Sequence, residues 1–424
     1  MRSKPPPSSE DEESRMIGII DFNDWELVIT NAEPVRNKKH YAAAAKGSKE
    51  MLFSEDALAL CRINPQLVNT QYLRKLSADP LSNPINGAKN HADLIFHHLR
   101  RIKEQSGVSK CVMVISEHYT DQQLGLLAGI AEAAGIEVLS FFNNALRVGP
   151  KQSMDLQFLD LGLSHACTTS VVFREGKLAT ADCQILEGSG FLNLIEGLLY
   201  LVAETFLDRD RFDVLANGAT EQQLFNQIRE QLEDSEPDSM SLSITSNDFN
   251  GRVELGREKI QELVKQKFIG LKLDPNRPLI LSSRAQRIPF ISNVLKEHGA
   301  QSVLNIKDDF FANYANLEIF VVPNSIQRIA TIDSLSEHGS PTGNLDKNNS
   351  PEVHKKEKAT HLVSNGSAWE LSHPRWHGFL DEEGLLRPNC QVLVNGSSPR
   401  SATINTRDKI HFEGSDFEAI RVEV

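Results

Sequence analysis

Residues 158–173, FLDLGLSHACTTSVVF, consist of two apolar runs joined by a turn that begins at Asp160. An Asp-x-Gly sequence between runs rich in β-branched and aromatic residues predicts a strand, a tight turn and a second strand. Residues 16–30, MIGIIDFNDWELVIT, repeat this organisation, with Asp21 in the position of Asp160. The chain therefore has two strand–turn–strand motifs, each with an aspartate where the first strand ends.

Helix and strand patterns alternate after each motif. Helical periodicity is followed by short runs that are apolar on both faces, which is typical of strands in a sheet covered by helices. The predicted helices cover 92–107, 120–135, 190–207, 219–232 and 256–271, and the predicted strands cover 111–116, 136–143 and 278–283. This alternation predicts an α/β architecture in two halves, about 16–150 and about 151–333.

Composition limits the functional classes. The 424 residues carry a net charge of −12 and have no run of Lys and Arg. No apolar run approaches the roughly 20 residues that a membrane-spanning helix needs. We therefore expect a cytoplasmic protein that binds neither nucleic acid nor membrane. The five cysteines lack metal-binding spacing, and we expect free thiols.

The composition changes towards both ends of the chain. Residues 1–15 are rich in proline, serine and acidic residues, and we expect a solvated tail. Residues 334–358 are polar and contain glycine, proline and asparagine, which is typical of a flexible linker. Residues 359–424 hold several short β-like runs, among them CQVLVNG and KIHFEG, which predict a small all-β module.

Six segments of 17–333, taken in order, resemble the nucleotide-binding domain of the DnaK-type heat-shock protein 70 family. GIIDFNDWELV (18–28) and LDLGLSHACTTSVV (159–172) correspond to its two phosphate loops, and ILEGSGF (185–191) to a glycine turn. The other segments are 53–76, 112–144 and LILSSRAQRIPFISNVL (279–295), of which the last corresponds to the adenosine loop. The resemblance implies an actin-like, two-lobed ATPase fold made of duplicated ribonuclease-H-like halves.

The resemblance also implies a set of site residues for ATP or ADP with Mg²⁺. Asp21 and Asp160 correspond to loop aspartates that orient metal-bound waters, and Lys75, or its neighbour Arg74, corresponds to a catalytic lysine. The positions implied to contact the nucleotide are Asn23, Asp24, Gly162, Gly188, Arg229, Ser282, Ser283 and Arg287. An aspartate at a strand end can also simply accept backbone hydrogen bonds and shape a turn, so a structural role for Asp21 and Asp160 stays open.

Both phosphate loops lack glycines that such loops need, because backbone N–H groups must approach phosphates without an intervening Cβ. Asn23, Asp24 and Trp25 stand in the first loop, and 163–165 (Leu-Ser-His) stand in the second. The Asp24 carboxylate would lie where the phosphate tail of a nucleotide sits. Two like charges about 4 Å apart would cost on the order of 4 kcal/mol there. A bound cation would reverse that sign, so Asp24 as an extra metal ligand is the alternative. We predict weak or lost ATP binding and impaired or absent hydrolysis.

The chain after 358 is too short for the peptide clamp and helical lid that follow this domain in the family. Residues 392–424 weakly resemble the closing strands of forkhead-associated domains, and a generic β-module for docking is the alternative. The leading hypothesis is a heat-shock-70-like protein with a degenerate nucleotide site, acting as a chaperone-related binding or regulatory scaffold. Its protein partner would bind through the C-terminal module. The alternatives are a slow ATP-hydrolysing switch of the heat-shock-70/actin superfamily and an actin-fold subunit that assembles with itself.

Overall fold

The computed structural model describes residues 17–30, 38–149, 152–234, 239–247, 249–306, 310, 320–321, 325–333 and parts of 361–420. The expected tail (1–15) and linker (334–358) lie outside the described residues. Contacts divide the chain into two compact units, Met1–Pro341 and Thr342–Val424, and each is described by itself. The fold is mixed α/β, with several sheets.

The first motif forms the centre of a six-stranded sheet. Its order is β18 (Gln327–Ile329), β10 (Glu137–Asn143), β9 (Lys110–Ile115), β1 (Gly18–Phe22), β2 (Glu26–Thr30) and β3 (Lys38–Tyr41). Strands β1, β2 and β3 pair antiparallel, whereas β9, β10 and β18 continue the sheet in parallel. The predicted second half of the chain thus also supplies β18 to the first sheet.

The second motif forms the centre of another six-stranded sheet. Its order is β17 (Val303–Asn305), β16 (Leu279–Leu281), β11 (Leu156–Leu161), β12 (His165–Arg174), β13 (Lys177–Glu187) and β19 (Thr331–Asp333). Here β11, β12 and β13 pair antiparallel, and β16 and β17 continue in parallel. From β17 to β13 the pairing pattern matches that of the first sheet from β10 to β3. Asp21 and Asp160 lie on the two equivalent central strands, β1 and β11.

The alternation of side chains along β1 and β11 places Asp21 and Asp160 on the sheet faces that share one apolar core. Ile20 and Phe22 of β1 pack in the core with the helices α4 (His91–Ser106) and α5 (Asp121–Ala133). Ile19 faces the opposite way, and it shares a core with Phe158 of β11. Because successive side chains on a strand point to opposite faces, Asp21 lies on the face of Ile19 and Asp160 on the face of Phe158.

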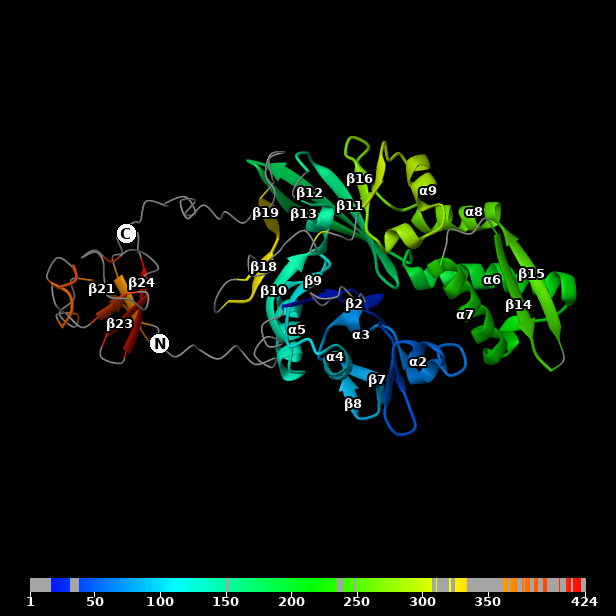
Figure 1. The fold of residues 1–424 in the computed structure, drawn as a ribbon, viewed down its shortest axis with the longest axis horizontal. Helices are drawn as coiled ribbons and strands as arrows, with labels where there is room; N and C mark the ends of the chain where they lie inside the picture. The colour runs from blue at the N-terminus through cyan, green and yellow to red at the C-terminus, as the bar shows by residue number, and fades with distance from the viewer. Residues whose placement is uncertain are drawn as a thin grey trace, which may run out of the picture. The chain divides into compact units, whose positions relative to one another are not determined.

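The outer face of the second sheet is covered by helices. Leu159 and Leu161 of β11 share a core with α6 (Phe191–Asp210), α7 (Gly218–Asp234), α8 (Arg257–Phe268) and α9 (Ile291–Glu297). The hairpin of β14 (Ser239–Thr245) and β15 (Asn250–Gly256) packs against α7 and α6 (Figure 1). The N-terminal end of α6 lies at the turn after β11, because the N–H groups of Phe191 and Leu192 donate to the carbonyls of Gly162 and Leu163 at 3.2 and 2.8 Å.

A smaller layer follows β3 in the chain. It contains the sheet of β4 (Ala44–Lys46), β5 (Met51–Phe53) and β6 (Val68–Asn69). The helices α2 (Glu55–Leu58) and α3 (Tyr72–Lys75) and the hairpin of β7 (Pro80–Ile85) and β8 (Ala88–Asn90) complete it. Ala43, Ala45, Ala57 and Leu58 join the core of α6 and α7, so this layer contacts residues of the second half.

The strands of the second unit form one sheet. Their order is β21 (Ser367–Glu370), β20 (His361–Ser364), β24 (Ser415–Ile420), β23 (Lys409–Phe412) and β22 (Val392–Val394). Leu362, Trp376, Phe379 and Ile410 belong to a separate apolar core of this unit. Across the parts of the chain that are described, no helix has the length and apolar character to cross a membrane.

Candidate functional site

Arg284 lies between the two aspartates. It follows β16, whose end is adjacent to that of β11 because the two strands are parallel. Its Nε and Nη2 donate to Oδ1 and Oδ2 of Asp160 at 3.0 and 2.8 Å, and its Nη1 lies 3.1 Å from Oδ1 of Asp21. Burial opposes the charged forms of Asp160 and Arg284. Their ion pair outweighs that effect, so the pKa of Asp160 is lowered and the pKa of Arg284 is raised well above its ordinary value.

A second arginine completes this cluster. Arg147 follows β10, and its Nη1 lies 2.8 Å from Oδ2 of Asp21 and 3.3 Å from Oδ1 of Asn144. The amide groups of Asn144 and Asn23 donate to Oδ2 of Asp160 at 2.8 and 3.3 Å. Two guanidinium groups thus balance two carboxylates, and a divalent cation at this place would meet no net negative charge.

Asp24 uses a backbone group of the second loop. Its Oδ1 accepts a hydrogen bond from the N–H of Leu163 at 3.2 Å, and its Oδ2 lies 3.5 Å from Nδ1 of His165. Asp24 is 2% exposed. Burial acts to raise its pKa, but the field of His165, with smaller contributions from His118 and Arg74, lowers it. The N–H group of Leu163 is therefore already bonded to a carboxylate of the protein itself.

The glycines of the second loop and of the turn at 188–190 fit this closed arrangement. A Cβ on Gly162 would lie 2.2 Å from Oδ1 of Asp24, and one on Gly190 would lie 2.4 Å from the backbone of Leu163. Gly188 has a φ of +75°, and its N–H donates to the carbonyl of Ser164 at 2.9 Å. The turn at 188–190 is thus packed directly on the second loop.

Two histidines lie beside Asp24. The rings of His118 and His165 are perpendicular, with centroids 5.0 Å apart, and Nδ1 of His118 lies 2.9 Å from Oγ of Ser116. Burial, together with the charges of His165 and Arg74, lowers the pKa of His118 to about 3. Nowhere in the described residues do three or more His, Cys, Asp or Glu side chains form a group that could hold a metal.

Glu117 is a further titratable group near Asp160. Its Oε1 accepts from the N–H of Ala145 at 2.6 Å, and its Oε2 accepts from the hydroxyl of Thr169 at 3.1 Å. Burial raises its pKa to about 7, and the charge of Asp160 adds to that effect. The Glu117 carboxyl is therefore a group that changes its protonation near neutral pH.

Trp25 fills the space next to the first loop. Its indole stacks on the ring of Phe191, with centroids 3.9 Å apart and an interplanar angle of 19°. The guanidinium carbon of Arg287 lies 3.9 Å from the centroid of the indole, and Arg287 also forms an ion pair with Glu26. Trp25 is 1% exposed, so the ring is enclosed by the protein itself.

Arg229 and Ser282, two other residues implied to contact a nucleotide, have partners within the protein. Arg229 donates to both carboxylate oxygens of Glu55 at 2.9 Å, and its guanidinium carbon lies 5.2 Å from the ring centroid of Tyr41. The hydroxyl of Ser282 accepts from the N–H of Ala285 at 3.0 Å, whereas Ser283 is half-buried in the same turn.

Arg74 and Lys75, the basic residues at the end of α3, lie in different environments. Lys75 is exposed, and its carbonyl accepts from the side chain of Gln123. Arg74 forms an ion pair with Glu187 at 2.8 Å, and its charge acts on the pKa of Asp24. Arg74, rather than Lys75, is thus the cation next to the two loops.

Several polar atoms in this region are buried without a hydrogen-bond partner in the described part of the chain. Near the second loop these are Oδ2 of Asp24, Nδ1 of His165 and Nε2 of His118. Around the indole they are Nε1 of Trp25, Oε2 of Glu26, Nε of Arg229, and Nε and Nη1 of Arg287. Natural proteins leave few such atoms, so both places are where ordered water would be expected.

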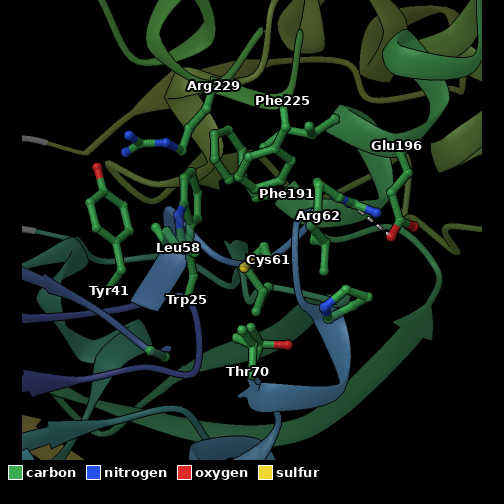
Figure 2. A pocket seen from close by; sticks show the side chains of 16 residues that line it. Trp25, Tyr41, Leu58, Cys61, Arg62, Thr70, Phe191, Glu196, Phe225 and Arg229 are labelled. Carbon is green, nitrogen blue, oxygen red and sulfur yellow. Dashed lines mark hydrogen bonds and ion pairs between the residues drawn. The ribbon is translucent and has the colours of Figure 1, made fainter. Parts of the chain in front are cut away.

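A pocket of about 170 Å³ lies beside Trp25, which forms part of its wall. Trp25, Tyr41, Phe191 and Phe225 contribute aromatic rings to its wall, and Arg62, Glu196 and Arg229 lie around it (Figure 2). Residues from α2, β6, α6 and α7 meet here. Asp21, Asp160 and Arg284 are not part of its lining.

Sequence reasoning missed Arg284, Arg147 and Glu117. Arg284 has a visible signal in the sequence, because SSRAQRIP (282–289) carries two arginines and is one residue longer than the adenosine loop that it resembles. Arg147 and Glu117 follow strands in segments that were otherwise assigned, and nothing in their local pattern distinguishes them from surface charges.

The comparisons with known proteins identify no family. No protein-family model and no curated protein matches this chain.

Proposed function

We propose that the first unit has an actin-like fold of the heat-shock-70 type whose nucleotide site is filled by its own side chains. The supporting feature of the fold is the repeated strand order of the two six-stranded sheets, with an aspartate on each central strand. In this proposal the protein is a chaperone-related binding or regulatory scaffold, and its conformation does not depend on ATP.

The observation that carries this proposal is the position of Arg284. Its guanidinium contacts both Asp21 and Asp160, the two carboxylates that would orient the waters of a bound Mg²⁺. Asp24 adds an internal anion on the N–H of Leu163, where a phosphate would bind. An ATP–Mg complex would have to displace a buried cation and a buried carboxylate at once. Breaking such pairs is costly, because each leaves an uncompensated buried charge.

The same contacts join the two halves of the unit. Asp21 and Glu26, from the first half, pair with Arg284 and Arg287 of the second. The ion pairs Glu55–Arg229, Arg62–Glu196 and Arg74–Glu187 also connect the halves. In an actin-like ATPase, nucleotide would hold the lobes together; here protein side chains make those connections. A fixed arrangement of lobes suits a binding scaffold better than a switch.

Equilibrium binding decides between the scaffold and the slow switch. We expect no saturable binding of a fluorescent ATP analogue to the full chain at micromolar concentrations, with or without Mg²⁺, and phosphate release at the background rate. Magnesium-dependent, saturable binding that Asp160→Ala abolishes would instead establish the switch.

The proposed partner is a protein that binds the second unit. Support comes from the separate apolar core of that unit, which includes Trp376, Phe379 and Ile410. We expect the full chain to capture the partner equally well with and without ATP, and a chain that ends at Pro341 to lose it. Capture that required ATP would argue against the scaffold, and capture by the shortened chain would place the partner on the first unit.

A further inference from the structure

The pocket beside Trp25 has a mostly apolar wall. The lining includes the rings of Trp25, Tyr41, Phe191 and Phe225 and the aliphatic side chains of Leu58, Val68, Leu163, Leu192 and Ile195. Pro65 is exposed, and Thr70 and Leu192 are partly exposed, so solvent reaches this space. Figure 2 shows the aromatic side chains arranged around the same opening. Such a wall favours a ligand with a flat apolar surface.

The charges at the pocket are neutralised within the protein. Arg62 pairs with Glu196 at 3.3 Å and with Glu221 at 3.4 Å. Arg229 pairs with Glu55 and Glu233. The two lining arginines are therefore balanced by carboxylates that already contact them. A charged ligand would enter an apolar space without gaining a free counter-ion, and the desolvation of its charge would oppose binding.

The volume of the pocket limits the size of the ligand. A cavity of about 150 Å³ lined by aliphatic and aromatic residues can hold a benzene molecule. At about 170 Å³, this pocket matches one or two fused rings rather than a nucleotide. Cys61 belongs to the lining, and burial raises the pKa of its thiol to about 11, so it adds a neutral surface.

We propose that this pocket binds a small, uncharged aromatic molecule of one or two rings, between the layer of α2 and β6 and the helices α6 and α7. The ring would contact Phe191 and Phe225, and the ligand would lie apart from the Asp21–Arg284–Asp160 cluster. Trp25, Leu163 and Arg229 line the pocket and also belong to segments that resemble the nucleotide site, but Asp21, Asp160 and Arg284 do not line it. Indole binding and ATP binding are measured separately, so the two proposals can fail separately.

Indole and its charged analogues test this site on the full chain. We expect indole to bind saturably, with a Kd below about 1 mM by calorimetry. Indole-3-acetate and tryptamine have the same rings with a negative and a positive charge, and we expect each to bind at least about tenfold more weakly. Absence of saturable indole binding, or equal binding of either charged analogue, would overturn the proposal.

Two substitutions on one helix locate the binding. Leu192 lines the pocket, whereas Leu207 lies further along α6, is 46% exposed and is not part of the lining. Leu192→Trp should fill the pocket and weaken indole binding at least about tenfold, and Leu207→Trp should leave the affinity unchanged. Val68→Phe fills the same space from β6, and it replaces Leu192→Trp if that variant melts at a lower temperature. Unchanged affinity in a folded pocket-filling variant would refute the assignment.

Discussion

The guanidinium of Arg284 makes two parallel hydrogen bonds to the carboxylate of Asp160, at 3.0 and 2.8 Å. Both residues are almost fully buried: Asp160 lies on β11, and Arg284 follows the adjacent parallel strand β16, which ends at the same edge of the sheet. Charge-assisted, bidentate pairs of this kind are among the strongest polar interactions in proteins. The edge where a ligand would be expected in an α/β sheet is thus occupied by an internal ion pair.

Removing this cation should strongly destabilise the first unit. Arg284→Ala leaves Asp21 and Asp160 buried with less compensation, and we expect a loss of about 3–5 kcal/mol in the free energy of unfolding. Urea denaturation measures it. Arg174→Ala is the matched control, because Arg174 pairs with Asp155 but is 69% exposed, and we expect a much smaller change in the free energy of unfolding. Similar losses in both variants would mean that the buried pair has no special role.

Divalent cations should partly replace the missing guanidinium. In Arg284→Ala, two carboxylates remain on the facing sheets, and Arg147 balances one of them. Millimolar Mg²⁺ should therefore raise the melting temperature of Arg284→Ala but not that of the original chain. An equal effect on both would show that Arg284 does not stand in the place of a metal.

Glu117 should give the unit a pH dependence of defined sign. Its pKa is about 7 in the folded chain, against an ordinary value of 4.5, so the folded state holds the proton more tightly than the unfolded state. The contribution of Glu117 to the free energy of unfolding is therefore fully present below pH 4.5 and is lost as pH rises through about 7. Glu117→Gln keeps the shape and removes the titration.

A comparison of Glu117→Gln with the original chain isolates this contribution. His118, whose pKa is about 3, acts in the opposite direction, because protonation of the unfolded state lowers stability as pH falls below 6.5. The difference in unfolding free energy between Glu117→Gln and the original chain, measured at about pH 5 and about pH 8, should change by 1–3 kcal/mol. A constant difference would show that Glu117 is ionised throughout.

The strands and helices that carry the site follow closely from the sequence. Gly18–Phe22 and Glu26–Thr30 form the strand pair that the sequence predicts, Thr120 caps α5, and Gly107 follows α4 in the left-handed region. Local patterns suffice there, because hydrophobic periodicity and capping residues are properties of short segments. The Arg284–Asp21 contact could not be predicted in the same way, since it joins residues that are distant in the chain and depends on how the two sheets face each other.

Alanine substitutions at Gly190 in the site and at Gly129 in α5 should change the stability of the chain in opposite directions. In Gly190→Ala the new Cβ would meet the backbone of Leu163 at 2.4 Å, and backbone atoms cannot move aside as a flexible side chain can. We expect a loss of more than about 1 kcal/mol. Gly129 lies in α5 with no heavy atom within 4 Å of a Cβ, so Gly129→Ala should stabilise the chain by about 0.5–1 kcal/mol. Thermal unfolding measures both, and stabilisation by Gly190→Ala would contradict the close packing of this turn on the second loop.

Trp25 and Arg287 should be energetically coupled. Trp25→Ala removes a buried ring that stacks on Phe191, and we expect a cost of about 3–5 kcal/mol. In a double-mutant cycle with Arg287→Ala, the guanidinium 3.9 Å from the indole centroid should give a coupling energy of about 1–2 kcal/mol, because the pair is desolvated. The control is the pair on α4 formed by exposed Arg100 and half-buried Phe96, at 5.7 Å, which should give about 0.5 kcal/mol or less. Additive losses at Trp25 and Arg287 would mean that the indole fills the space without being held by the arginine, and the enclosure of the first loop would then rest on Phe191 alone.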